Sequence, residues 1–94
     1  MKKINYSIIV TGKVQGVWFR KYTKDKADEL GIKGYVRNES DSTVFISAEG
    51  TKEVLRKFIE WLYKGSPLSK VSEVNYDNYI DLQSFTEFEI RKRV

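Results

Sequence analysis

A short segment near the N-terminus combines two glycines with an arginine that opens an expected helix. It runs from Gly12 to Arg20 and reads GKVQGVWFR. Main-chain N–H groups that curve around a bound oxyanion need residues without a Cβ atom at the tightest points, and a guanidinium beside them adds a permanent positive charge. These residue types in this order therefore predict a cradle for an anion.

The residue types that the chain lacks narrow the chemistry. The 94 residues include no Cys and no His, which removes disulfides, thiolate nucleophiles, imidazole acids or bases and the usual zinc sites. Lys and Arg number 17 against 13 Asp and Glu, a formal charge of +4. This excess favours acidic ligands, but it also fits a surface that merely keeps the protein in solution. We expect no metal and no cofactor.

The elements that must position the segment follow from the periodicity of apolar residues. Alternation predicts four strands and a short fifth one, over residues 4–11, 32–38, 43–49, 70–78 and 87–91. Helical spacing predicts one helix over 19–30, ended by Gly31, and a second one between Thr51 and Gly65.

This order of elements predicts a fold. A β-α-β-β-α-β order with a small terminal strand fits a single α+β domain over 1–94, with two helices on one face of a mainly antiparallel, ferredoxin-like sheet. In that topology the first two strands are parallel with the third between them, so their carboxyl ends share an edge. The glycine loop and Asn38 then lie roughly 10 Å apart, or two strand spacings. A phosphate and an attacking water would fit between them.

No segment of the sequence predicts export or a membrane span. The longest apolar runs fall short of the eighteen residues that a spanning helix needs, and Met1-Lys2-Lys3 leads directly into the first strand. We therefore expect a cytoplasmic protein without membrane contact, acting as a monomer.

Each candidate site residue also has an ordinary structural explanation. Arg20 could be a solvated first-turn arginine, and Asn38 could bond its own hairpin. Gln15 could be an ordinary loop amide. Trp18 and Phe19 are expected to dock the helix in the core rather than to stack on a ligand.

The longer pattern resembles a known family. The segment Gly12–Arg20, the run Gly34–Asn38 (GYVRN), Val44 and Gly50 resemble the two signature motifs of the acylphosphatase family. The resemblance covers nearly the whole chain, including the order of strands and helices and a looser match at Gly65–Leu68. It implies hydrolysis of small acyl phosphates, the mixed anhydrides of carboxylic and phosphoric acids, without a metal. Inorganic phosphate would be both a product and a competitive ligand.

The resemblance also implies roles for individual residues. Arg20 matches the arginine that binds the phosphate, and Asn38 matches the asparagine that positions the nucleophilic water. The main-chain N–H groups that cradle the phosphate oxygens belong to the matching loop of Gln15, Gly16, Val17, Trp18 and Phe19.

The chemistry of these groups agrees with that implication. Arg20 and Asn38 cannot act as general bases, because a guanidinium stays protonated and an amide is essentially non-basic. An ordinary phosphate ester would need an acid or a metal at its leaving oxygen. An acyl phosphate needs neither, because its leaving carboxylate has a conjugate acid with a pKa of roughly 4, near that of Asp or Glu.

Three serines depart from the family pattern. Ser42 replaces a turn glycine, and a side chain on a left-handed turn residue could cost roughly 1 kcal/mol or shift the hairpin that follows Asn38. Ser66 and Ser69 replace the commoner Pro and Ala before the fourth strand, where we expect an effect on local packing only.

Other classes fit less well. RNA-recognition domains share the order of elements, but Lys33–Arg37 reproduces only the opening of their aromatic motif, so we expect no nucleic-acid partner. A cysteine-dependent phosphatase would need its nucleophile at position 14, which is Val14. The acidic residues of 25–29 and 77–81 lack a calcium-loop spacing and are expected to face solvent. A phosphate-binding module without turnover remains open; it would keep Arg20 but tolerate loss of Asn38.

Overall fold

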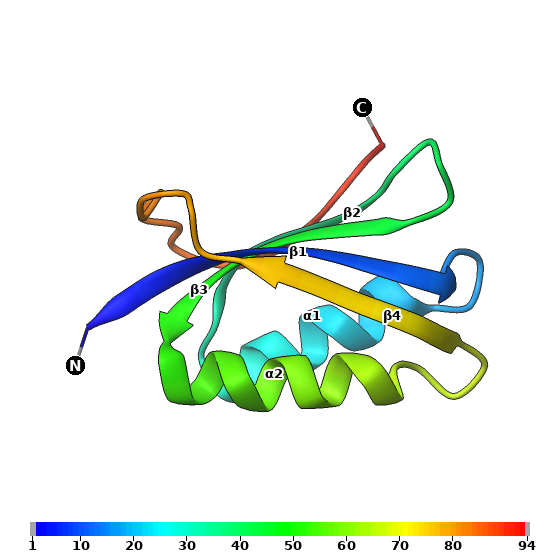
Figure 1. Cartoon of the computed structure of the whole chain (residues 1–94), viewed down its shortest axis with the longest axis horizontal. Coiled ribbons are helices and arrows are strands. Elements are labelled where there is room, and N and C mark those ends of the chain that lie inside the picture. Colours follow the sequence, from blue (N-terminus) through cyan, green and yellow to red (C-terminus); the bar gives the residue numbers. More distant parts are fainter. Residues whose placement is uncertain (1, 94) are drawn as a thin grey trace.

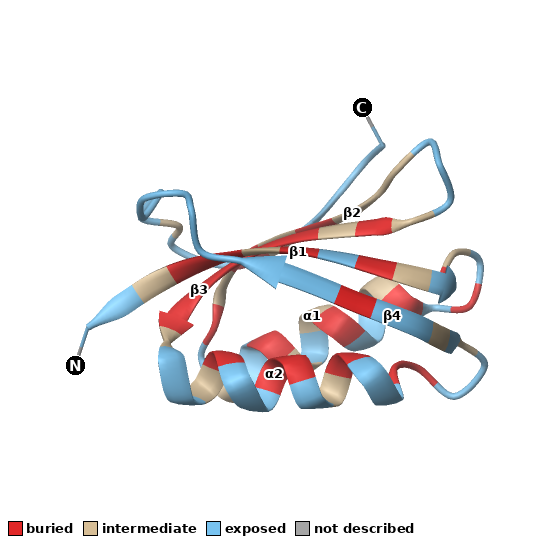
Figure 2. Cartoon of the chain, in the orientation of Figure 1, coloured by how far each residue is buried: buried red, intermediate tan, exposed pale blue. Residues whose placement is uncertain are grey.

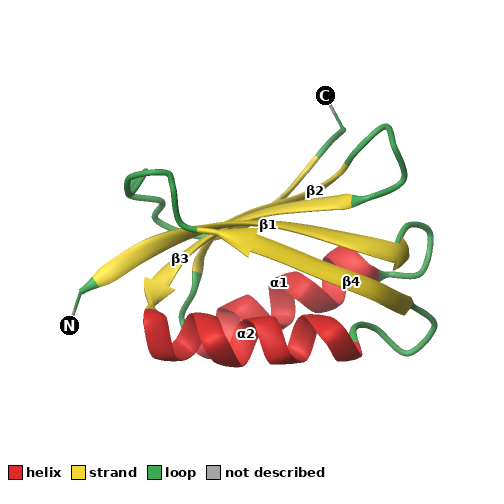
Figure 3. Ribbon diagram, viewed as in Figure 1, coloured by secondary structure: helices red, strands yellow, loops and turns green. Residues whose placement is uncertain are grey.

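The chain forms the expected elements in the expected order. The computed structural model describes residues 2–93, over which the elements are β1 (Lys3–Lys13), α1 (Phe19–Leu30), β2 (Lys33–Asn38), β3 (Val44–Thr51), α2 (Lys52–Lys64), β4 (Lys70–Asp77) and β5 (Phe88–Arg91). Both helices cover the same face of the sheet (Figure 1 and Figure 3). The predicted ferredoxin-like α+β fold is confirmed.

The sheet has the strand order β4-β1-β3-β2-β5. β3 pairs antiparallel with both β1 and β2, and β4 pairs antiparallel with β1, whereas β5 pairs parallel with β2. Because β1 and β2 both oppose β3, they run in the same direction with one strand between them. Their carboxyl ends therefore lie at the same edge of the sheet, as the topology predicted.

The core lies between the helices and the sheet face that they cover (Figure 2). Ile8 and Val10 of β1 and Phe58 and Leu62 of α2 have no exposed side-chain surface. Burial of each such side chain stabilises the fold by about 1.5–3 kcal/mol. The apolar residues that alternate along the strands and those that recur at helical spacing in the sequence both belong to this layer.

Two of the predicted helix boundaries have the expected chemistry. α1 ends at Gly31, whose φ is 72° and whose N–H donates to the main-chain oxygens of Ala27 and Asp28. α2 begins after Thr51, whose side chain accepts a hydrogen bond from the N–H of Val54 at 3.4 Å. The start of α1 is different, since its N-cap Trp18 makes no side-chain capping bond.

The segment between β4 and β5 crosses the sheet face that the helices leave open (Figure 1). The buried carboxylate of Glu49 holds it, because this group accepts hydrogen bonds from the N–H groups of Gln83 at 2.5 Å and Phe85 at 3.3 Å. Asn5 donates to the same carboxylate at 2.9 Å. This anchor returns the chain to the sheet edge, where β5 pairs with β2 and brings Ile90 beside the candidate site.

Candidate active site

Three loops meet at the end of the sheet where β1 and β2 terminate (right in Figure 1). They are residues 14–18 between β1 and α1, residues 39–43 between β2 and β3, and residues 65–69 between α2 and β4. Beside the first of these loops is a pocket of about 420 Å³, within the range of about 300–1,000 Å³ that is typical of small-molecule sites. Its lining residues are Val14, Gly16, Trp18, Phe19, Arg20, Lys21, Asn38 and Ile90.

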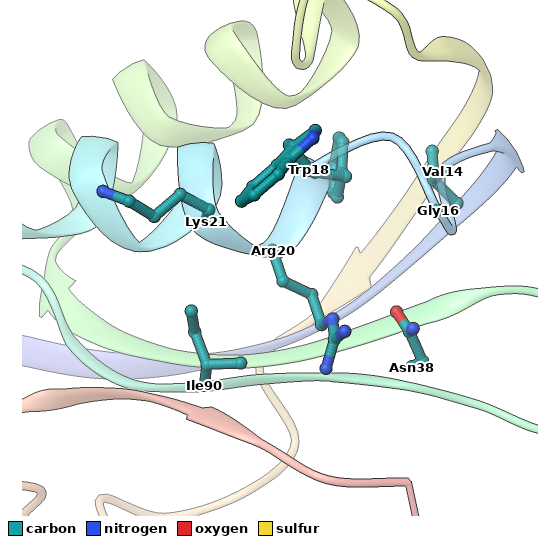
Figure 4. Close-up of a pocket in the computed structure, with 8 residues that line it drawn as sticks. Val14, Gly16, Trp18, Arg20, Lys21, Asn38 and Ile90 are labelled. Atoms are coloured by element: carbon teal, nitrogen blue, oxygen red, sulfur yellow. The ribbon is translucent and has the colours of Figure 1, made fainter.

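The structure brings Arg20 and Asn38 together in this pocket. The side chain of Arg20 extends from the first turn of α1, and that of Asn38 extends from the end of β2 (Figure 4). Asn38 shares the helix-facing side of β2 with Val36, which is fully buried. Two residues that are 18 positions apart in the sequence thus line one pocket because the topology joins the ends of their elements.

Asn38 has an unused acceptor. Its Oδ1 atom is buried and accepts no hydrogen bond from any described residue. The hairpin does not need this side chain, because the N–H of Glu39 donates to the main-chain oxygen of Thr43 at 2.9 Å and closes it. A buried polar atom without a partner costs about 1–3 kcal/mol, so the Oδ1 atom is suited to hold a water or ligand group.

The Arg20 guanidinium makes no ion pair and no hydrogen bond within residues 2–93. The acidic side chains on the same helix are engaged elsewhere, since Asp25 pairs with Lys21 at 2.8 Å and Asp28 pairs with Lys24 at 2.8 Å. Arg37, by contrast, pairs with Glu39 at 2.7 Å, and this hydrogen bond raises the pKa of Arg37 above its ordinary value. Of these two arginines, Arg20 has the donors available for an anion.

The two glycines of the segment serve different purposes. Gly12 lies within β1, and a Cβ atom there would collide with the main-chain oxygen of Lys70 in β4. Gly16 has a φ of 73°, and a Cβ atom there would meet no atom within 4 Å. Gly12 therefore permits close strand contact, whereas Gly16 permits the left-handed backbone of the loop at the pocket.

The main-chain N–H groups of the loop beside the pocket are unpaired within the described residues. Among the described residues, the N–H groups of Gln15, Gly16, Val17, Trp18 and Phe19 donate to no main-chain or side-chain acceptor. The first N–H groups of a helix have no partner inside the helix, and α1 has no capping side chain. Such N–H groups beside a guanidinium are suited to bind an anion.

The expectation that Trp18 belongs to the core is wrong. Trp18 is 72% exposed, whereas Phe19 is 1% exposed and packs against Trp61 with ring centroids 6.2 Å apart. Trp18 has φ 63° and ψ 16°, a left-handed conformation that costs a bulky residue about 1–2 kcal/mol. This backbone turns the indole away from the core, and apolar spacing at a loop–helix junction does not reveal it.

Gln15 contributes its side chain to the hairpin as well as its N–H group to the loop. Its Nε2 donates to the main-chain oxygens of Glu39 and Thr43, both at 2.9 Å, and its Oε1 accepts from Arg93 at 3.0 Å. Gln15 thus joins the loop to the turn that follows Asn38. The resemblance signalled Gln15 without revealing these partners.

Ser66 is a residue whose contact the sequence did not reveal. Its buried hydroxyl donates to the main-chain oxygen of Val17 at 2.8 Å. Ser69 in turn donates to the main-chain oxygen of Ser66 at 2.7 Å. The expectation that Ser66 affects only local packing is wrong, because its hydroxyl contacts the loop at the pocket. In the sequence, only the departure of Ser66 from the family pattern signalled that this position was unusual.

Ser42 does not shift the hairpin. Its φ of 76° is in the left-handed region that the usual glycine would adopt, and Asn38 still pairs with Val44 in a regular register. Asp41 supports the same turn by accepting from the hydroxyl of Thr43 at 2.6 Å and from its N–H at 3.1 Å. These bonds hold the pKa of Asp41 below its ordinary value.

Residues 2–93 contain no group of three or more His, Cys, Asp or Glu side chains placed to hold a metal ion. Neither helix in this part of the chain is long and apolar enough to cross a membrane.

Comparison with known proteins identifies the class to which the chain belongs. The Acylphosphatase family model matches residues 6–90. The chain is 45% identical over 87 residues to an acylphosphatase of Bacillus licheniformis, covering 93% of this chain and 97% of that protein. It is 45% identical over 86 residues to acylphosphatase-1 of Gallus gallus, covering 88% and 87%. The crystal structure of an acylphosphatase from Bacillus subtilis matches with a TM-score of 0.91 at 39% identity, covering 94% of this chain and 98% of that one.

Fold and comparisons together define a small α+β hydrolase. The chain belongs to the acylphosphatase family, as its signature residues predicted.

Proposed function

We propose that the chain hydrolyses acyl phosphates to a carboxylate and inorganic phosphate by in-line attack of water, without a metal ion. Arg20 and the main-chain N–H groups of residues 15–19 bind the equatorial oxygens of the phosphoryl group, and Asn38 orients the water. One observation carries the proposal: Arg20 and Asn38 line the same pocket, and neither has its polar side-chain atoms fully paired within residues 2–93. All these groups come from residues 15–38, so the site needs no second copy of the chain.

The proposed step balances without a protein acid or base. The water oxygen forms a bond to phosphorus while the bond from phosphorus to the acyl oxygen breaks, and the carboxylate leaves with the electron pair. Its conjugate acid has a pKa of roughly 4, so it leaves unprotonated at neutral pH. The proton of the attacking water goes to an oxygen of the phosphate.

The contribution of the pocket is positioning and charge. The loop that carries the N–H groups is held by Ser66 through Val17 and by Gln15 through the hairpin. A preorganised donor aimed at charge that develops in the transition state contributes about 100- to 1,000-fold in rate. A bidentate guanidinium should contribute at least as much.

The test is hydrolysis of benzoyl phosphate in excess chelator by the wild type, by Arg20→Ala and by Arg20→Lys. We expect undiminished turnover by the wild type and a fall in kcat/KM of about 100-fold or more for both variants, because an ammonium lacks the planar fork. Arg56→Ala, at an exposed helix position paired with Glu60, serves as the matched control. Wild-type turnover by Arg20→Ala would overturn the role of Arg20. Loss of turnover in chelator that added magnesium restores would overturn metal independence.

A further inference from the structure

The pocket has an apolar end beside its polar end. Trp18 and Ile90 both line it, and they are 72% and 42% exposed. Single exposed apolar residues are common on protein surfaces, but these two come from α1's N-cap and from β5 and both line the pocket that holds Arg20. Neither residue is needed to bind a phosphate, which presents only polar oxygens.

The exposure of Trp18 is built into the backbone. Its left-handed φ of 63° turns the indole outward, while the next residue, Phe19, is buried. Among the described residues the indole stacks on no other ring, although it lines a second surface pocket together with Tyr22. Strained conformations of bulky residues cluster at functional sites, and a large exposed ring held in this way at the mouth of a pocket is suited to contact a ligand.

The geometry of in-line attack decides which end of the pocket receives the acyl group. The attacking and leaving oxygens must lie on opposite sides of phosphorus, so the acyl group lies on the side away from the water that Asn38 orients. In Figure 4 the Arg20 guanidinium lies between Asn38 on one side and Ile90 on the other. Ile90 pairs with Val36, two residues before Asn38, which separates Ile90 and Asn38 by about 8 Å, from one strand spacing and two residue rises.

The charge around the apolar end is already balanced. Lys21 also lines the pocket, but its ammonium pairs with Asp25 at 2.8 Å. Within residues 2–93, this end of the pocket therefore offers apolar surface and no unpaired cation for a second carboxylate or phosphate on the substrate.

We propose that Trp18 and Ile90 form an acyl subsite that selects acyl phosphates with an uncharged, aromatic or branched apolar acyl group. The subsite rests on the proposed function, since the direction of the leaving group follows from the water at Asn38. Trp18 contributes its indole here in addition to its N–H group in the loop, and Ile90 is a specificity-determining residue without a role at phosphorus.

The ratio of kcat/KM for benzoyl phosphate to that for acetyl phosphate tests the subsite, because an effect common to both substrates cancels. We expect Trp18→Ala and Ile90→Ala each to lower this ratio by about 10-fold, the effect of removing a small apolar contact from a substrate pocket. Trp18→Phe should restore most of the ratio. Tyr79→Ala, which removes an 88% exposed ring from the β4–β5 segment, should leave both rates unchanged.

Inhibition by inorganic phosphate, measured for each variant, reports whether the phosphate-binding half is intact. An unchanged ratio in both Trp18→Ala and Ile90→Ala, with acetyl phosphate still hydrolysed, would overturn the subsite and leave the proposed function standing. Failure of the wild type to hydrolyse either substrate would overturn the proposed function itself.

Discussion

The side-chain amide of Gln15 donates to the main-chain oxygen of Glu39 at 2.9 Å, which ties the loop before α1 to the residue that follows Asn38. The same nitrogen donates to the main-chain oxygen of Thr43, at the other end of the hairpin turn. One side chain therefore couples the two halves of the candidate site. The bridge thus adds to the pairing of Asn38 with Val44 in the sheet, and both hold Asn38 relative to the loop N–H groups.

Replacement of Gln15 by Met tests the bridge, because Met keeps the length of the side chain and removes its hydrogen bonds. We expect kcat for benzoyl phosphate to fall by about 10- to 100-fold, since a displacement of about 1 Å at a reacting group can cost 100-fold. Inhibition by inorganic phosphate should weaken less, because Arg20 stays in place. Gln83→Met, at an exposed glutamine outside the site, is the matched control. A Gln15→Met variant with wild-type kcat would contradict the coupling.

Ser66→Ala should remove a second contact that holds the loop of residues 14–18. Loss of the hydroxyl leaves the Val17 oxygen without its donor, and a buried unsatisfied acceptor costs about 1–3 kcal/mol in free energy of unfolding. Urea unfolding measures this cost, and the inhibition constant of inorganic phosphate should rise with it. Ser69→Ala removes a neighbouring hydroxyl that bonds Ser66 rather than the loop, so it should leave phosphate inhibition unchanged. Equal effects of both variants on phosphate inhibition would count against a specific role of Ser66.

Ser42→Gly should stabilise the protein by about 0.5 kcal/mol, because glycine relieves the left-handed strain at φ 76° and loses part of that gain to the entropy of its unfolded chain. Thermal unfolding should then shift upward by about 2–4 °C. Ser40→Gly, in the same turn and without a positive φ, should shift it downward. Shifts of the same sign for both serines would show that strain at Ser42 is not the cause.

The sequence predicts those parts of the site that follow from topology. Alternation and helical spacing locate β1, α1 and β2, and the handedness of the crossover then places Arg20 and Asn38 at one edge of the sheet. No side-chain contact between the two residues is needed for that inference, which is why it holds from sequence alone.

The remaining features depend on single torsions and on contacts between distant segments. Trp18 is apolar and precedes a helix, which is typical of a core residue, and only its left-handed backbone turns it outward. The bond from Ser66 to Val17 spans 49 positions, and the bond from Gln15 to Glu39 spans 24. Local periodicity carries no information about such partners, because they are set when the loops pack against one another.

Asn38→Ala separates the two proposed roles, phosphate binding by Arg20 and positioning of the water by Asn38. Benzoyl phosphate hydrolysis and inhibition by inorganic phosphate are measured on this variant beside the wild type and Arg20→Ala. We predict that Asn38→Ala lowers kcat by about 100-fold or more and keeps the wild-type inhibition constant for phosphate, whereas Arg20→Ala loses phosphate inhibition as well. Wild-type kcat in Asn38→Ala, or a loss of phosphate binding equal to that of Arg20→Ala, would contradict the division of roles.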